Sequence, residues 1–399
     1  MSKPIHNPSG PSLTTGFTLL ELVVAMALSL LLFGLCLTLV QQLGNTADLV
    51  GSMSDVNENL RAAVNMVSRD LSNAGENIPR TGIPLPYGGT ATAIKLPYPA
   101  YASGSTFHAP LSGATSLLWP VIYAGNAAGP TQGSGTNAFT TDIVTIISVN
   151  QTSNFNQTAV TGSPTVSSTS ATITVTTTAA GYVQAGQLIM LTNSNGNCLL
   201  AVSSVNTTNG VITFTKGDAN DVLGVNQFSI LSTGSVAFAV TSGPASGTIS
   251  FLQSGTTSNG TTTYSWPAIT AYPISMVTYY LDNSNSPTKL MKLVTAGATS
   301  SAQPVALGIN VMTLQYSLYP FATLNGSTSD PTENPWPTTT DTGNSPNDIR
   351  KVVLTMIAET DHQNHANSQW YSKEIKNAVT VQNLDYYNKY NLGAKLTAD

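Results

Sequence analysis

Charged residues are scarce in this sequence. Asp, Glu, Lys and Arg make up 8% of its 399 residues, whereas an average globular domain carries about 25%. The formal net charge is -5, and the 14 Lys and Arg residues are scattered along the chain. No basic stripe is available to neutralise a row of phosphates, so the sequence gives no indication of nucleic-acid binding. Ser, Thr, Asn and Gly must supply most of the polar surface, which is typical of a secreted or surface β protein.

Cysteine is nearly absent as well. Cys36 lies in an apolar N-terminal run, and Cys198 lies far along the polar remainder of the chain. A disulfide needs two Cα atoms within about 7 Å of each other, so we do not expect these residues to pair. The cysteines therefore do not report on the redox state of the compartment.

Local signatures of catalysis are missing too. The sequence contains no P-loop, C-x-x-C or G-x-S-x-G run, so we expect neither an enzyme nor a cofactor. One group of potential metal ligands stands out, namely Glu359, Asp361, His362 and His365. Two imidazoles beside carboxylates suit a divalent metal. A polar turn between two strands is the simpler interpretation, and we predict no metal site.

Two loops and a set of aromatics are weaker candidates. The loops at Asp282 (LDNSNSP) and 217–221 (GDAND) have oxygen ligands at alternate positions, as calcium loops do, but they lack a downstream bidentate acid. We therefore favour plain turns. The aromatic set could line a sugar-binding face or belong to the core, as strand aromatics mostly do; it consists of Trp266, Tyr279, Tyr280 and Trp370.

The strongest positive feature is an apolar run at residues 17–40, FTLLELVVAMALSLLLFGLCLTLV. As a helix it is long enough to span about 30 Å of hydrocarbon. Its only charge is Glu21, and an unpaired charge in lipid costs several kcal/mol, so Glu21 needs a cation nearby. An ordinary signal peptide has a shorter apolar core and a small-residue cleavage site. A plain single-pass anchor would leave Glu21 unexplained.

Gly16, Phe17 and Glu21 resemble the prepilin motif, in which a leader ends in Gly and the fifth mature residue is Glu. The resemblance implies that residues 1–16 are a leader cut after Gly16 by a prepilin peptidase, which also methylates Phe17. It further implies that Glu21 neutralises the N-terminal amine of a neighbouring subunit during assembly. A buried amine and a buried carboxylate stabilise each other, and an acid in the first turn complements the helix dipole.

The helix is predicted to continue through residues 41–74 as an amphipathic segment. Apolar residues recur at spacings of three and four, which marks one helix face; they are Leu49, Met53, Val56, Leu60, Val64, Val67 and Leu71. Gly75, Asn77 and Pro79 then end the helix. One helix from Phe17 to about Ala74 would be about 87 Å long.

Residues 75–399 are predicted to form a β-rich head. Residues 79–137 are rich in Pro and Gly and should be mainly extended loop. Short apolar segments then recur between turn residues, as in antiparallel sheets: DIVTIISV, SATITVTT, QLIML, LLAVSSV, VITF, FSIL, VAFAV and TISFL. Asn209-Gly210 marks the clearest hairpin. Stronger strand blocks cover 275–283, 289–294, 310–319, 348–359 and 373–384, with a long loop at 319–348 that joins two paired strands.

Residues 16–80 and 275–384 resemble the PilW family of minor pilins, and residues 150–270 are a possible inserted β subdomain. The resemblance implies an α+β fold, with a long pilin helix on an antiparallel head. It implies a minor pilin that helps start or modify a type IV pilus, in adhesion, twitching or DNA uptake. Expected partners are other pilins, the inner-membrane assembly platform, the prepilin peptidase and, before assembly, membrane lipid. The head would lie in the periplasm and then on the cell surface. A minor pseudopilin of type II secretion and a membrane-anchored adhesin are the alternatives.

Overall fold

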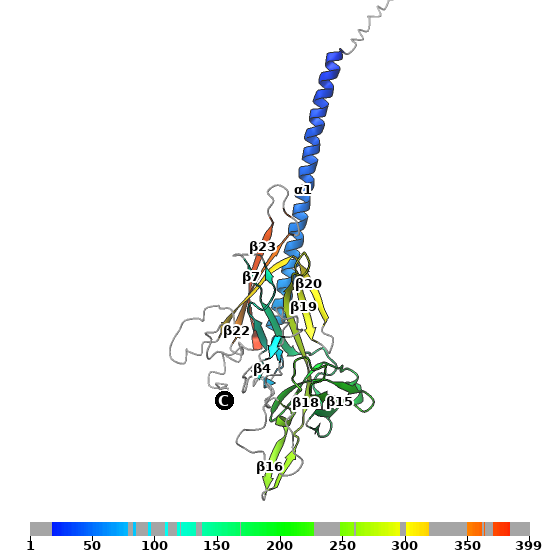
Figure 1. Cartoon of the computed structure of the whole chain (residues 1–399), viewed down its shortest axis with the longest axis vertical. Coiled ribbons are helices and arrows are strands. Elements are labelled where there is room, and N and C mark those ends of the chain that lie inside the picture. Colours follow the sequence, from blue (N-terminus) through cyan, green and yellow to red (C-terminus); the bar gives the residue numbers. More distant parts are fainter. Residues whose placement is uncertain are drawn as a thin grey trace, which may run out of the picture.

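The computed structural model describes residues 18–78, 83–84, 95–96, 108–110, 118–119, 121–132, 138–167, 169–226, 248–258, 261–295, 301–318, 349–360, 363 and 370–383. One long helix is followed by a β-rich head in which every strand pair is antiparallel. Half of the helix projects from the head (Figure 1). The predicted α+β class is confirmed at this level.

Helix α1 covers Leu19–Ser72, with Thr18 as N-cap and Asn73 as C-cap. Its 54 residues make it about 81 Å long. The chain leaves the helix through Gly75, which has φ +73 and lies against Val121, where a Cβ would approach a methyl group to 2.9 Å. The predicted end near residue 74 is therefore correct to within two residues. The predicted start, Phe17, lies outside the described residues.

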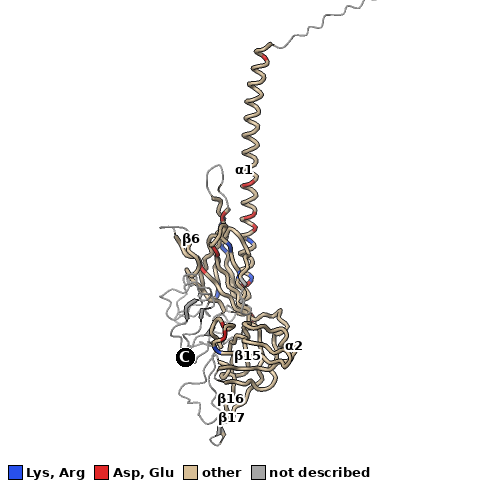
Figure 2. Tube along the Cα trace, turned by 45° about the vertical axis from the view of Figure 1, so that its right-hand side comes forward, with Lys and Arg blue, Asp and Glu red and all other residues tan. Residues whose placement is uncertain are grey.

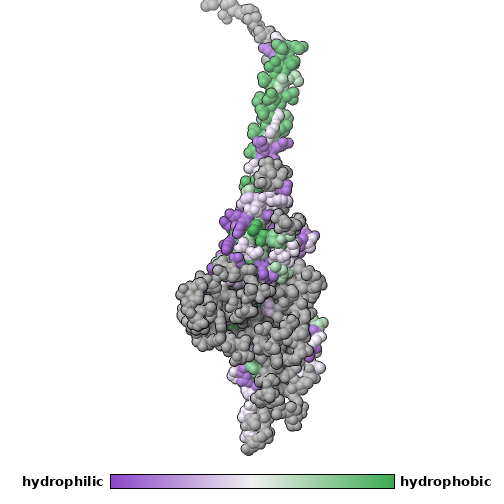
Figure 3. Space-filling view, turned by 60° about the vertical axis from the view of Figure 1, so that its left-hand side comes forward, coloured by the Kyte–Doolittle hydropathy of each residue, from purple (hydrophilic) through white to green (hydrophobic). Residues whose placement is uncertain are grey.

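The two halves of α1 have opposite surroundings. Nearly all side chains of residues 19–50 are exposed although most are apolar, and they form the hydrophobic end of the molecule (Figure 3). Further along, the predicted packing face is buried at Val56, Leu60, Val64, Val67 and Leu71. Leu49 and Met53, the first two predicted members, are only partly covered. The packing half of α1 therefore begins at Val56.

An eight-stranded sheet covers one side of this packing half. Its longest strand, β18 (Thr270–Asp282), pairs with β12 and β9 near its start and with β8 and β19 near its end. The other strands are β5 (Ile122–Gly125), β8 (Ile143–Val149), β9 (Thr158–Ala159), β12 (Leu188–Asn193), β13 (Gly196–Ala201), β19 (Lys289–Thr295) and β20 (Ser301–Leu307).

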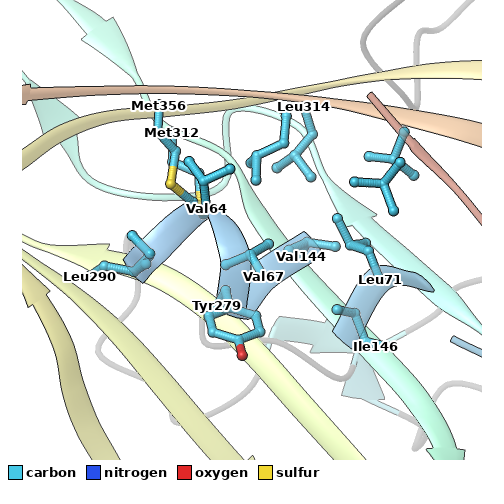
Figure 4. Close-up of a cluster of buried hydrophobic side chains, with 14 of the residues drawn as sticks. Val64, Val67, Leu71, Val144, Ile146, Tyr279, Leu290, Met312, Leu314 and Met356 are labelled. Atoms are coloured by element: carbon cyan, nitrogen blue, oxygen red, sulfur yellow. The ribbon is translucent and has the colours of Figure 1, made fainter. Parts of the chain in front are cut away.

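A three-stranded sheet covers the other side, in the order β21 (Ile309–Leu318), β22 (Ile349–Glu359) and β23 (Ser372–Thr380). Val64, Val67 and Leu71 lie between the two sheets (Figure 4). They meet Met312, Leu314 and Met356 from the smaller sheet and Val144, Ile146, Tyr279 and Leu290 from the larger one. Burying one such side chain stabilises the fold by about 1.5–3 kcal/mol, so the helix is the centre of the main core.

A second core lies at the end of the head away from the apolar half of α1 (Figure 1). It is covered by a four-stranded sheet, here called the distal sheet, and by the short helix α2 (Thr177–Ala180). In spatial order the distal sheet consists of β10 (Thr165–Val166), β11 (Ser170–Thr174), β15 (Val211–Thr215) and β14 (Ser204–Asn206). Ile173, Ile212 and Phe214 point inward and are fully buried.

Short elements complete the described chain. They are the strand pairs β1 (Ile83–Pro84) with β4 (Leu118–Trp119), β2 (Lys95–Leu96) with β3 (His108–Pro110), β6 (Thr131–Gln132) with β7 (Phe139–Thr140) and β16 (Ser254–Ser258) with β17 (Thr261–Ser265), and the 3-10 helix η3 (Ile249–Leu252). The prediction that residues 79–137 are mainly loop with few strands is wrong for the described parts of that segment, which hold six short strands, β1 to β6.

Most predicted strands are confirmed, including the Asn209-Gly210 hairpin, where Gly210 has φ +68 and a Cβ would meet Val175 O at 2.1 Å. TISFL is wrong as a strand, because it forms η3. Its three-residue turn places both Ile249 and Leu252 in the core, and Leu252 O accepts hydrogen bonds from the side chains of Asn193 and Asn195. FSIL and VAFAV lie outside the described residues.

Strand β20 was not predicted, and it contains Pro304, a residue type that is disfavoured within a sheet. It is tolerated because β20 pairs only with β19 in the described sheet. Part of the segment predicted as a possible insertion, residues 150–270, pairs with the main sheet. β12 and β13 fall within residues 150–270, yet β12 pairs with β18 and so belongs to the main sheet.

Candidate functional site

The start of α1 is the site that the sequence motif indicates. Thr18 is in an extended conformation, and its hydroxyl accepts a hydrogen bond from Glu21 N at 3.3 Å. Glu21 Oε2 in turn accepts from Thr18 N at 3.1 Å and from the Thr18 hydroxyl at 3.0 Å. This reciprocal arrangement is a capping box, which satisfies backbone N–H groups that the first helical turn leaves unpaired.

The described chain offers no cation to Glu21. Its ion pairs, Arg69–Asp70 and Lys292–Asp70, both lie in or beside the packing half of α1. The cation that the sequence predicts for Glu21 would therefore have to come from another chain or from residues outside the described part. Gly16 and Phe17, the predicted cleavage and methylation residues, lie outside it too. Of the residues in the motif and its cap, the structure therefore describes only Thr18 and Glu21.

The surface next to Glu21 is apolar on all sides. Leu19, Leu20 and Val23 are 82%, 72% and 54% exposed, and hydrophobic side chains continue along the projecting half of α1 (Figure 3). Within the described part of the chain, α1 is the one helix long and apolar enough to cross a membrane. A surface of this kind is stable in water only when lipid or other apolar helices cover it.

Asp70 fixes the orientation of α1 on the head. Its Oδ2 atom accepts a hydrogen bond from the Tyr279 hydroxyl at 2.6 Å and from Lys292 Nζ at 2.8 Å. The Lys292 ammonium also lies 5.5 Å from the centre of the Tyr279 ring. Burial and the neighbouring carboxylate raise the pKa of Tyr279 far above its usual value. Two side chains of the large sheet therefore hold one acid of the helix in place.

Of the four metal candidates, only Glu359 lies in the described part of the chain. Glu359 accepts a hydrogen bond from Asn310 Nδ2 at 2.6 Å, while Asp361, His362 and His365 lie outside the described residues. Among those that are described, no three His, Cys, Asp or Glu side chains are grouped as metal ligands would be.

The two oxygen-rich loops are turns. Asp282 accepts a hydrogen bond from Ser284 N at 2.9 Å in the β18–β19 connection, and this bond lowers its pKa. Asp221 accepts from Val225 N and Asn226 N. Burial raises the pKa of Asp221. Both acids therefore serve local backbone geometry.

The aromatic set does not form one surface. Tyr279 is fully buried beneath α1, so for this residue the core alternative is confirmed. Trp266 packs against the second core, whereas Trp370 is 49% exposed, just before β23.

Thr18 was missed from the sequence, although a signal was there. Thr-Leu-Leu-Glu at residues 18–21 has the spacing of a capping box, a hydroxyl residue followed three positions later by Glu.

Searches against protein-family models, curated proteins and solved structures find no match to this chain.

Proposed function

We propose that this chain is a type IV pilin-like subunit, with the organisation of a minor pilin of the PilW family. In this proposal the chain is cut after Gly16 and methylated at Phe17, held in the inner membrane by α1, and then transferred into a filament. The observation that carries the proposal is one continuous helix whose N-terminal half is apolar and uncovered, while its other half is the centre of the head core.

The two halves suit two environments in turn. An apolar helix surface needs lipid before assembly and neighbouring helices afterwards. The head can keep its structure during the transfer, since its core uses only α1 residues from Val56 onward. Glu21 would exchange its contacts with Thr18 for the amine of a neighbouring Phe17. The favourable pairing of two otherwise costly charges supports this step.

Mass spectrometry of the mature N-terminus tests the cleavage. The expected result is a chain that begins at Phe17 and carries one added methyl group. A chain that retains residues 1–16, or that begins beyond residue 40, would contradict the proposal, because no amine would then be available opposite Glu21.

Two substitutions separate the local role of Glu21 from its proposed role between subunits. Glu21→Gln keeps a side chain that can complete the capping box but removes the charge, and Glu21→Ala removes both. We expect both variants to be cleaved and both to fail to enter filaments, measured by immunoblotting of sheared filaments. Asp55→Ala, at an exposed position on the same helix, is the control. Normal incorporation of Glu21→Gln would show that capping alone explains Glu21.

A further inference from the structure

The outward face of the distal sheet is an ordered array of hydroxyl groups. Inward residues such as Ile173 and Ile212 are buried, so the alternate residues face outward. Apart from Val211 and Asn206, the outward residues of the paired strand positions are all Ser or Thr. We call this array the hydroxyl face; it consists of Thr165, Ser170, Thr172, Thr174, Ser204, Thr213 and Thr215.

The hydroxyls form rows across the strands. Thr165 pairs with Thr172, Thr172 pairs with Thr213, and Thr213 pairs with Ser204, so one row crosses all four strands. Ser170 and Thr215 form the start of a second row. Neighbouring strands in such a sheet lie about 4.8 Å apart, which sets the spacing at which the rows repeat.

Most of these hydroxyls have unused hydrogen-bonding capacity. In the part of the chain that the structure describes, the side-chain oxygens of Thr172, Thr213 and Thr215 make no hydrogen bond to protein. Each hydroxyl can donate one bond and accept two. The face therefore offers a repeating set of neutral groups, each able both to donate and to accept.

Charge is almost absent around the face. Between Ile143 and Leu281 the charged residues are Lys216, Asp218 and Asp221, and Asp221 is buried against its own loop. Figure 2 shows few charged residues around β15, β16 and β17 and more along the packing half of α1. An anionic polymer would find one Lys here, too few for phosphate or carboxylate recognition.

We propose that the hydroxyl face binds a neutral polysaccharide. Sugar hydroxyls are uncharged, both donate and accept hydrogen bonds, and repeat along a chain, as the groups on the face do. The distal sheet lies at the far end of the head from the apolar half of α1 (Figure 1), so a chain anchored by that helix holds the distal sheet away from the membrane. This inference rests on the proposed pilin function and adds a ligand class to it. Its test needs no filaments, so the polysaccharide proposal and the pilin proposal can fail separately.

The test is retention of the full chain, in detergent micelles, on insoluble cellulose, chitin and starch, with alginate gel as the anionic comparison. We expect retention on at least one neutral polymer, with no change between low and high salt because no ion pairs are involved. Thr172→Val with Thr213→Val removes two hydroxyls at nearly constant shape. Since each hydrogen bond contributes modestly, we expect affinity to fall about tenfold.

Thr380→Val is the matched control, because Thr380 is an exposed strand residue of the three-stranded sheet. It should bind as the unaltered chain does, and both variants should unfold at the same temperature as that chain. Three results would overturn the inference: no retention on any neutral polymer, equal retention of the double variant, or retention only on alginate that disappears with salt.

Discussion

The two halves of α1 are both rich in apolar residues, yet only one is covered within the chain. Leu60 and Leu71 are fully buried between two sheets, whereas Leu31 and Leu35 are 62% and 55% exposed. From Leu19 to Val40 the exposed half is predominantly apolar on every side, and a mostly polar segment, residues 41–48, follows. The buried half carries polar residues on the side away from its core. The pattern of apolar residues, more than their number, indicates which half the head covers and which half needs lipid or other helices.

Substitutions in the two halves of α1 test this comparison, and we expect the largest loss of stability from Leu60→Ala. It leaves a cavity in the main core, and such changes cost about 2–5 kcal/mol. Leu31→Ala, at an exposed position in the other half, should leave the stability of the head unchanged. Denaturant unfolding of the full chain in micelles measures both; equal destabilisation would mean that the projecting half also packs within the chain.

A smaller effect is expected at the polar contact of the packing half. Asp70→Ala leaves the Tyr279 hydroxyl and Lys292 without their shared acceptor, which we expect to cost about 1–3 kcal/mol. Asp55→Ala, exposed on the same helix, serves as the reference. If the two variants unfold at the same denaturant concentration, Asp70 does not hold the helix on the sheet.

Asp142 should make the stability of the covered half of α1 and its two sheets depend on pH. It accepts hydrogen bonds from Ala127 N at 2.8 Å and Leu314 N at 2.7 Å, so it links the two sheets that enclose the helix. Burial raises the pKa of Asp142 above its usual value of 3.8. An acid with a raised pKa binds its proton more tightly in the folded state. Its contribution to stability is therefore complete below the usual pKa and is lost as pH rises through the raised one.

Asp142→Asn should remove this dependence and, at neutral pH, cost about 1–3 kcal/mol because one buried N–H loses its acceptor. The free energy of unfolding, measured from about pH 4 to about pH 7, should fall more steeply with pH for the unaltered chain than for the variant. Parallel curves would show that Asp142 does not titrate in this range. Asp221, whose pKa is also raised, remains in both chains.

The smallest effect is expected at the start of α1. Thr18→Val removes the N-cap, which costs about 0.5–2 kcal/mol locally, and the loss should appear as faster amide exchange in the first turn. The head should unfold as before, since its core begins at Val56. Thr18→Ser keeps the cap and is the control. A lower stability of the head in Thr18→Val would show that the two halves are coupled.

Much of this architecture could be predicted from local patterns. Spacings of three and four marked the buried face of α1, Gly75 marked its end, and alternating β-branched residues marked β8, β11, β15 and β18. The η3 helix left no such pattern, and the hydrogen bonds that Leu252 O accepts come from Asn193 and Asn195, which are distant in sequence. Asp70 binds Tyr279 and Lys292, which are more than 200 positions away in the sequence. These contacts likewise left no local signal.

The sequence by itself determined the long helix, the contrast between its halves and the antiparallel character of the head, since each depends on periodicities within a few residues. Only the tertiary structure decided that α1 lies between two sheets, that Tyr279 is a core residue, and that Thr165, Thr172, Thr213 and Ser204 form one row. These features depend on which distant strands pair. Strand pairing is set by the burial of the whole head, and a short segment does not contain that information.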